Sequence, residues 1–202
     1  MPNIVYTVGA ITFPLAACQR LFDQIVKPLS LGKFRRTKPE DYRVLLFQTN
    51  DTGEDQTDLI CDIVHWVTQT SCKSFALALN GLEYSENDGR VYLALSDIPA
   101  TQGLKTESAF IAYLGSLLRK NLTEAEVALA FSTAIGSRMQ IGKVEDFYNR
   151  SSIILPPQCS NLTLAATRIS VVRIEQANHG NAIATPLAHI PLPVTAPIDS
   201  SS

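Results

Sequence analysis

Residues 34–48, FRRTKPEDYRVLLFQ, join a basic loop to an apolar strand. Arg35, Arg36 and Lys38 make the loop basic, and the run that starts at Asp41 is rich in β-branched, aliphatic and aromatic residues, which predicts a strand. Before this stretch, an apolar stripe at helical spacing predicts a helix that begins near Pro14 and ends before Gly32.

The pattern of the whole chain predicts an α+β fold with mostly antiparallel sheets. Helices are expected near 14–29, 54–71 and 106–120, and strands at 3–12, 41–48, 74–80, 90–96, 125–133, 161–175 and 182–190. The segment 125–133 is rich in alanine, so a helix is the alternative there. Asp88-Gly89 is a hairpin signal between two of these strands. Residues 136–160 are expected to be mostly loop. Helices and strands do not alternate strictly, so a doubly wound parallel sheet is disfavoured.

Composition limits the class of protein. The 202 residues are 46% hydrophobic and carry a net charge of −2, from 17 basic and 19 acidic side chains. A chain this apolar forms a core, and its balanced charge argues against a broad electrostatic nucleic-acid surface. We expect one domain over residues 1–192, with a flexible tail rich in Pro and Ser over 193–202.

Cysteine and histidine usage predicts no metal and no cofactor. Cys61 and His65 share one helix face, but two ligands are too few for a zinc site. No secretory signal opens the sequence and no apolar run is long enough to span a bilayer, so we expect a cytoplasmic protein with no membrane partner.

The order of segments resembles the 2H phosphoesterases, typified by bacterial 2′-5′ RNA ligase-like RNA 2′,3′-cyclic phosphodiesterases. The resemblance lies in the basic loop and Pro39-Glu40-Asp41-Tyr42, and in the strands FALALNG (75–81), RVYLAL (90–95) and ATRISVVRI (166–174). It implies a two-lobed fold around a central cleft. Each lobe would contribute one His-x-Thr, with one histidine as general base, the other as general acid, and the threonines holding phosphate oxygens.

Both His-x-Thr motifs are missing at the positions where the resemblance predicts them. Arg43-Val44-Leu45 stands at the first position. The resemblance puts the second near Glu126, at residues 126–128, whereas a weak echo between residues 40–47 and 124–131 puts it at 127–129. We prefer the first register, because Val127, Leu129 and Phe131 then form the core face of the strand. The sequence has three histidines, and none lies between His65 and His179, so we assign no catalytic residue.

Five residues are candidate ligand-binding positions in the expected cleft: Arg43, Glu126, Tyr6, Thr133 and Arg138. The Arg43 guanidinium suits a phosphate, although it would instead pair with Glu126 if the two faced each other. Tyr6 would stack on a base or pack in the core. Thr133 and Arg138 belong to a Gly-containing segment that would contact a phosphate, although it matches no phosphate-loop motif.

These observations favour a catalytically degenerate 2H-like protein that binds a nucleotide, an RNA phosphate or a protein partner. One alternative is an active phosphodiesterase for 2′,3′-cyclic or 2′-5′ substrates, with Glu126 as base and Arg43 as electrostatic stabiliser. A second alternative is an α+β interaction domain without a ligand site.

Overall fold

The structure of the chain is a computed structural model that describes residues 4–31, 33–50, 56–72, 75–85, 87–97, 109–131, 135–145, 162–176 and 182–193. The strands are β1 (Ile4–Thr12), β2 (Phe34–Arg36), β3 (Arg43–Gln48), β4 (Phe75–Tyr84), β5 (Arg90–Asp97), β6 (Arg138–Val144), β7 (Thr163–Ala166), β8 (Arg168–Gln176) and β9 (Ala182–Pro191). The helices are α1 (Leu15–Leu21), α2 (Gln56–Ser71) and α3 (Ala109–Glu124), with a π-helical turn at Phe22–Val26 and a 3-10 turn at Pro39–Asp41.

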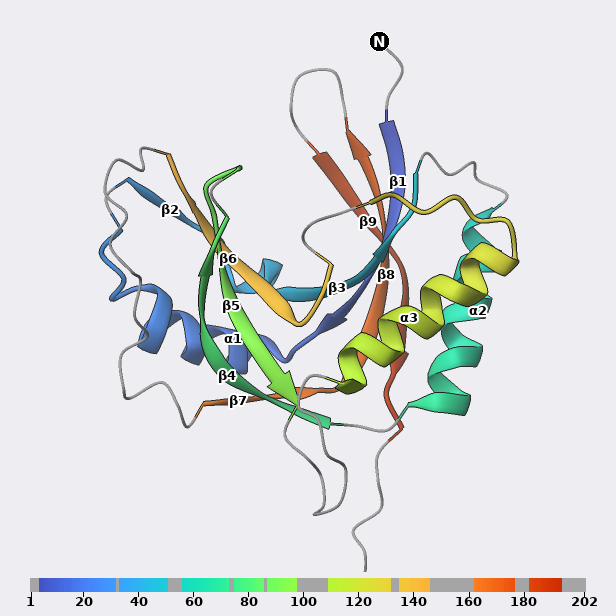
Figure 1. The fold of residues 1–202 in the computed structure, drawn as a ribbon, viewed down its shortest axis with the longest axis horizontal. Coiled ribbons are helices and arrows are strands. Elements are labelled where there is room, and N and C mark those ends of the chain that lie inside the picture. Colours follow the sequence, from blue (N-terminus) through green and yellow to red (C-terminus); the bar gives the residue numbers. More distant parts are fainter. Residues whose placement is uncertain are drawn as a thin grey trace, which may run out of the picture.

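All nine strands belong to one antiparallel, curled sheet (Figure 1). Its order is β7-β4-β5-β6-β3-β1-β8-β9, and β2 pairs with β6. Strands β4 to β6 therefore form one group and β3, β1, β8 and β9 form another, with the β3–β6 pair between them. The predicted α+β class and antiparallel sheet are confirmed.

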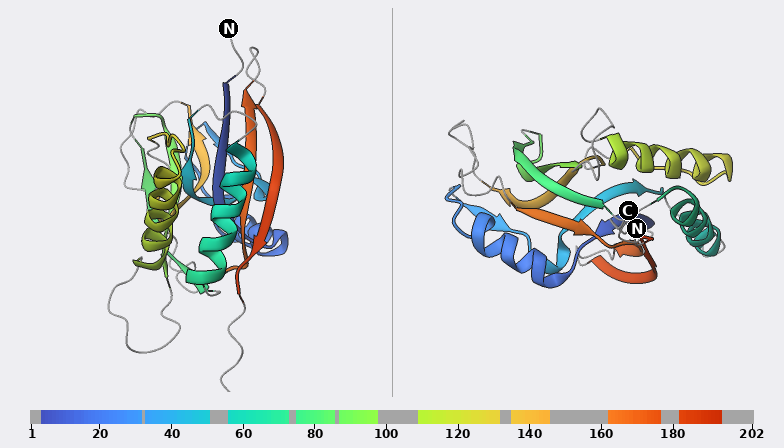
Figure 2. Two further views of the ribbon diagram at one scale, coloured as in Figure 1. Left: turned by 90° about the vertical axis from the view of Figure 1, so that its right-hand side faces the viewer. Right: turned by 90° about the horizontal axis from the view of Figure 1, so that it is seen from below.

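The helices lie at two ends of the molecule. α2 and α3 pack against each other, whereas α1 lies at the opposite end in both views from below and from the front (Figures 1 and 2). α2 buries one stripe, Ile60, Val64, Val67 and Thr68, as its apolar spacing predicts. Among the described helices, none is long and apolar enough to cross a membrane.

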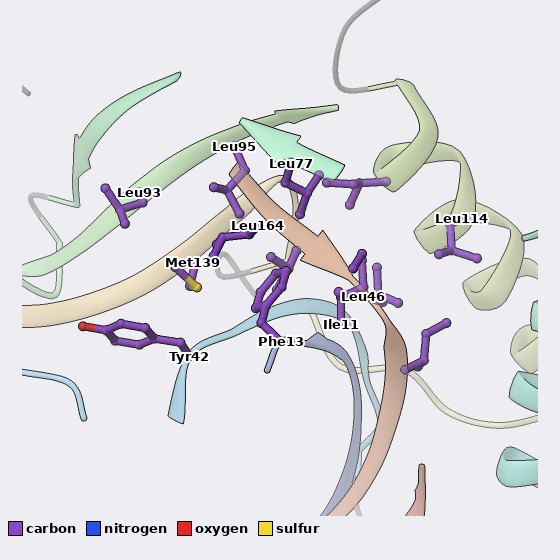
Figure 3. Close-up of a cluster of buried hydrophobic side chains, with 14 of the residues drawn as sticks. Ile11, Phe13, Tyr42, Leu46, Leu77, Leu93, Leu95, Leu114, Met139 and Leu164 are labelled. Carbon is purple, nitrogen blue, oxygen red and sulfur yellow. The ribbon is translucent and has the colours of Figure 1, made fainter. Parts of the chain in front are cut away.

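A single cluster of buried side chains joins the sheet to its helices (Figure 3). Ile11, Met139, Leu93 and Leu114 come from β1, β6, β5 and α3 and are at most 1% exposed. Side chains alternate between the faces of a strand, so the residues that flank Met139, Ile11 and Val44 point to the other face of the sheet. The buried cluster thus determines which residues are left on that second face.

Two segment predictions are wrong. Residues 125–133 were expected as a strand. Their described part, 125–131, follows the C-terminal end of α3 and contains one isolated bridge residue, Leu129, paired with Thr49. α3 extends to Glu124, and Glu126 adopts a left-handed φ of 61° that ends the helical run. Conversely, residues 138–144, expected as loop, form β6, where Met139 and Ile141 alternate into the core.

The predicted hairpin at Asp88-Gly89 is confirmed. β4 and β5 pair antiparallel on either side of it, and Gly89 has a φ of 70°, in the left-handed region that glycine adopts without a steric penalty. A Cβ at Gly89 would also come within 2.6 Å of the Val144 carbonyl oxygen, so this turn sits against the end of β6.

Candidate functional site

The centre of the sheet is the point where its two groups of strands meet. In the described residues, β3 and β6 are joined through one residue pair, Val44 and Met139, both fully buried. An antiparallel pair has a local two-fold axis, which here exchanges Arg43-Val44-Leu45 with Arg138-Met139-Gln140. Arg43 and Arg138 are therefore equivalent positions on two central strands.

Arg43 lies on the face of β3 opposite the core. Val44 and Leu46 are buried, whereas Arg43 and Leu45 are half-buried. Thr12 on β1 is the direct cross-strand partner of Arg43. Within the described part of the chain, the guanidinium has no hydrogen bond and no carboxylate partner, so it is available to an anion.

Arg138 lies on the same face but leans toward β5. Its guanidinium carbon is 4.6 Å from the centre of the Tyr92 ring, and Nη1 is 3.7 Å from Glu83 Oε2. The side chains of Arg138 and Glu83 are 26% and 52% exposed, so solvent weakens this ion pair. Cross-strand diagonal neighbours have Cα atoms roughly 7–8 Å apart, which sets the scale of the Arg43–Arg138 separation.

A chain of hydrogen bonds extends this face across β1, β8 and β9. Arg168 Nε donates to Thr12 Oγ1 over 3.1 Å, Thr12 Oγ1 and Ser170 Oγ are 2.9 Å apart, and Ser170 Oγ is 2.9 Å from His189 Nδ1. Ser170 is 2% exposed, so these contacts satisfy a buried hydroxyl.

The structure brings together two of the five predicted site residues and separates the others. Arg43 and Arg138 flank the β3–β6 pair. Tyr6 lies on β1, six residues from Thr12, opposite Ile174. Thr133 lies outside the described residues.

The alternative of an ion pair between Arg43 and Glu126 is not seen in the described residues. The Asn50 amide donates to the Ala128 carbonyl and the Ala130 amide to that of Gln48, so this antiparallel segment carries Glu126 past Asn50, away from Arg43. Seven residues of extended chain, roughly 23 Å, separate Arg43 from Asn50. The strand that is equivalent to β3 is β6, and neither of the two registers predicted near Glu126 supplies it.

Sequence reasoning also missed the residues that reach this face from other strands. Gln140, Thr12, Arg168 and Ser170 were not predicted, and His189 was not assigned to a site. Their alternation with Met139, Ile11, Ile169 and Ile190, which are buried, was a usable signal for the face, but not for which strands are neighbours.

The described residues contain no group of three or more His, Cys, Asp or Glu side chains arranged to hold a metal ion. Burial raises the pKa of Cys72 to about 11 and also raises that of Tyr42, mainly by desolvation. Both groups stay neutral at physiological pH, and they belong to the buried cluster.

Comparison with known proteins identifies the fold. No protein-family model matches the sequence, and no curated protein does. Solved structures do match: E. coli LigT complexed with 3′-AMP (TM-score 0.68, 14% identity, 94% of this chain and 99% of that chain) and a structure described as a phosphoesterase (0.69, 14%, 95% and 99%). TT0787 of Thermus thermophilus is similar as well (0.67, 15%, 93% and 97%).

These likenesses cover nearly the whole length of each protein. The chain therefore has the fold of the 2H phosphoesterases, and the resemblance drawn from the sequence is confirmed at the level of the fold. LigT has also been solved with phosphate, ATP and NADP+, so structures on this fold hold nucleotides.

Proposed function

We propose that this protein binds the phosphate of a nucleotide or an RNA end at Arg43 and Arg138, without turning it over. The observation that supports the proposal most strongly is the Val44–Met139 pair, which makes the two arginines equivalent across the centre of the sheet. A guanidinium presents several donors in a plane and binds phosphate through two parallel hydrogen bonds.

The same two residues account for the lack of turnover. General acid–base catalysis needs a group that gains and loses a proton near the working pH, which is why the resemblance implies a histidine from each lobe, expected from the sequence at position 43 and near position 126. In the register of β3 and β6, position 138 is instead the counterpart of position 43. Arginine stays protonated at any physiological pH, so it holds an anion but removes no proton from an attacking hydroxyl. Leu45 and Gln140 lie two residues further along each strand, where a threonine would complete each motif in this register.

The alternative of an active phosphodiesterase has no geometric support. It requires Glu126 as the base beside a phosphate held by Arg43, and the antiparallel run from Gln48 to Asn50 carries Glu126 away from that position. The Glu126 side chain is exposed, beyond the end of α3.

Calorimetric titration with adenosine 3′-monophosphate, adenosine 5′-monophosphate and 2′,3′-cyclic AMP tests the proposal, together with chromatography of each mixture after incubation. We expect saturable binding that Arg43→Gln and Arg138→Gln each weaken, with the cyclic nucleotide recovered intact. Binding that neither variant affects would contradict the assignment of the site. Hydrolysis of the cyclic nucleotide that is lost in Arg43→Gln would contradict the absence of turnover.

A further inference from the structure

We propose that the same face of the sheet carries a second anion-binding subsite, formed by Arg168, Thr12 and His189. The ligand would then be a short oligonucleotide with two phosphates separated by a nucleoside, one at Arg43 and Arg138 and one at Arg168. This inference rests on the proposed function and specifies its ligand.

The pairing of three strands puts the two subsites side by side. Thr12 on β1 is the cross-strand partner of Arg43 on β3 and also of Arg168 on β8. Paired residues lie on the same face, so both arginines project from the face that bears Thr12. With strands about 4.8 Å apart, the Cα atoms of Arg43 and Arg168 are roughly 10 Å from each other.

This spacing favours two separate phosphates over a pyrophosphate. Neighbouring phosphates of a pyrophosphate share one bridging oxygen, so they are held close together. Two phosphates with a nucleoside between them are further apart and suit two arginines on alternate strands. Thr12 then lies between the subsites, with its hydroxyl directed toward β8 by the Arg168 contact.

The second subsite is held in position by hydrogen bonds. Arg168 donates to Thr12 through Nε, and the two terminal nitrogens of its guanidinium have no partner in the described residues. Buried Ser170 joins Thr12 to Nδ1 of His189, which orients the imidazole ring. His189 is exposed, and its Nε2 has no hydrogen-bond partner among the described residues, so a ligand has access to it.

The charge of this part of the sheet also suits an anion. Strands β1, β3, β8 and β9 contain one carboxylate, Glu175. Its Oε1 is 3.2 Å from Arg173 Nε, and alternation along β8 puts both side chains on the face opposite Arg168 and Ser170. No carboxylate of these four strands therefore competes with a phosphate for Arg43 or Arg168.

Titration with three ligands separates the subsites: adenosine 5′-monophosphate, ADP, and the 5′-phosphorylated dinucleotide pApA. We expect pApA to bind at least tenfold more tightly than the monophosphate. The affinity of ADP should exceed that of the monophosphate by a much smaller factor. Arg168→Gln should remove most of the gain for pApA and change the monophosphate affinity less than twofold. Arg20→Gln, which removes the same charge from the exposed side of α1, is the matched control and should change neither.

The outcomes distinguish this inference from the function on which it rests. If Arg43→Gln leaves monophosphate binding unchanged, the proposed function fails, whatever Arg168→Gln does. If Arg43→Gln weakens binding of the monophosphate and Arg168→Gln weakens the monophosphate and pApA equally, Arg168 belongs to the first site and the second subsite is refuted. An equal affinity for pApA and the monophosphate in the wild-type protein also refutes it. Thr12→Val, which removes the hydroxyl between the subsites, should weaken pApA in the same direction as Arg168→Gln.

Discussion

Replacement of Arg43 by glutamine should weaken nucleotide binding without unfolding the protein. The side chain is half-buried, on the face opposite the core, and has no carboxylate partner in the described residues, so its loss leaves no buried charge uncompensated. A hydrogen bond to a charged group contributes about 1.5–3 kcal/mol, and partial exposure of Arg43 favours the lower part of that range. We therefore expect a loss of about 1.5–2 kcal/mol, which is roughly a 10- to 30-fold rise in Kd.

Isothermal titration with adenosine 3′-monophosphate at fixed salt measures this change, with Arg20→Gln as the control for the loss of one positive charge. Thermal unfolding of each variant shows whether the fold is intact. A Kd that rises equally in Arg43→Gln and Arg20→Gln would mean that attraction by the net charge of the protein accounts for binding. A Kd unchanged in Arg43→Gln would show that no phosphate is bound beside β3.

Glu83→Gln should strengthen nucleotide binding about 1.5- to 5-fold in the same titration, because Glu83 competes with the phosphate for Arg138 and this exposed ion pair contributes about 0.2–1 kcal/mol. Weaker binding in the variant would contradict competition between Glu83 and the phosphate. Gly9→Ala should lower the free energy of unfolding in urea by about 1–3 kcal/mol, because a Cβ there overlaps the buried Phe47 ring; an unchanged midpoint would contradict it. Burial raises the pKa of Cys72 from 9.0 to about 11, so the folded state keeps a proton that the unfolded state loses. Stability should accordingly fall as the pH rises from about 9 to 11, and the difference in free energy of unfolding between wild type and Cys72→Ala should shrink over that range; a constant difference would show that Cys72 does not contribute.

Local sequence signals predicted the elements whose causes are local. The period of apolar residues predicted a helix over 54–71, and α2 spans Gln56–Ser71. Asp88-Gly89 predicted a hairpin because a left-handed turn residue determines the connection by itself. The boundaries of α3 were less well predicted. Alanine and glutamate near residue 125 favour a helix, whereas the alternation of Val127, Leu129 and Phe131 is typical of a strand.

The centre of the sheet depends on contacts that are distant in sequence. Val44 and Met139 are 95 positions apart, and nothing in either segment indicates that they pair. Gly142 and Lys143 interrupt the apolar alternation of β6, which is why residues 138–144 resembled a loop. The glycine is required there, because a Cβ would overlap the Phe34 ring where β2 pairs with β6.

The residues of the candidate site were likewise predictable where a local sequence signal exists, and not where their position depends on contacts distant in sequence. Arg43 was found because it lies directly after Pro39-Glu40-Asp41-Tyr42, within one continuous segment. Arg138 was predicted because it belongs to a Gly-containing segment that resembles a loop. Its equivalence to Arg43 became visible only with the β3–β6 register. The hydrogen-bond chain from Arg168 to His189 needs three strands in the correct order, and that order is a property of the fold.

NMR observation of the arginine Nε–Hε groups during titration with adenosine 3′-monophosphate tests directly whether Arg43 and Arg138 hold one phosphate between them. Loss of one signal in each of the variants Arg43→Gln, Arg138→Gln and Arg20→Gln assigns the three resonances. We expect the Arg43 and Arg138 signals to shift together and to saturate at the same nucleotide concentration, while the Arg20 signal stays in place. Saturable binding that leaves the Arg43 and Arg138 signals unmoved would contradict this expectation.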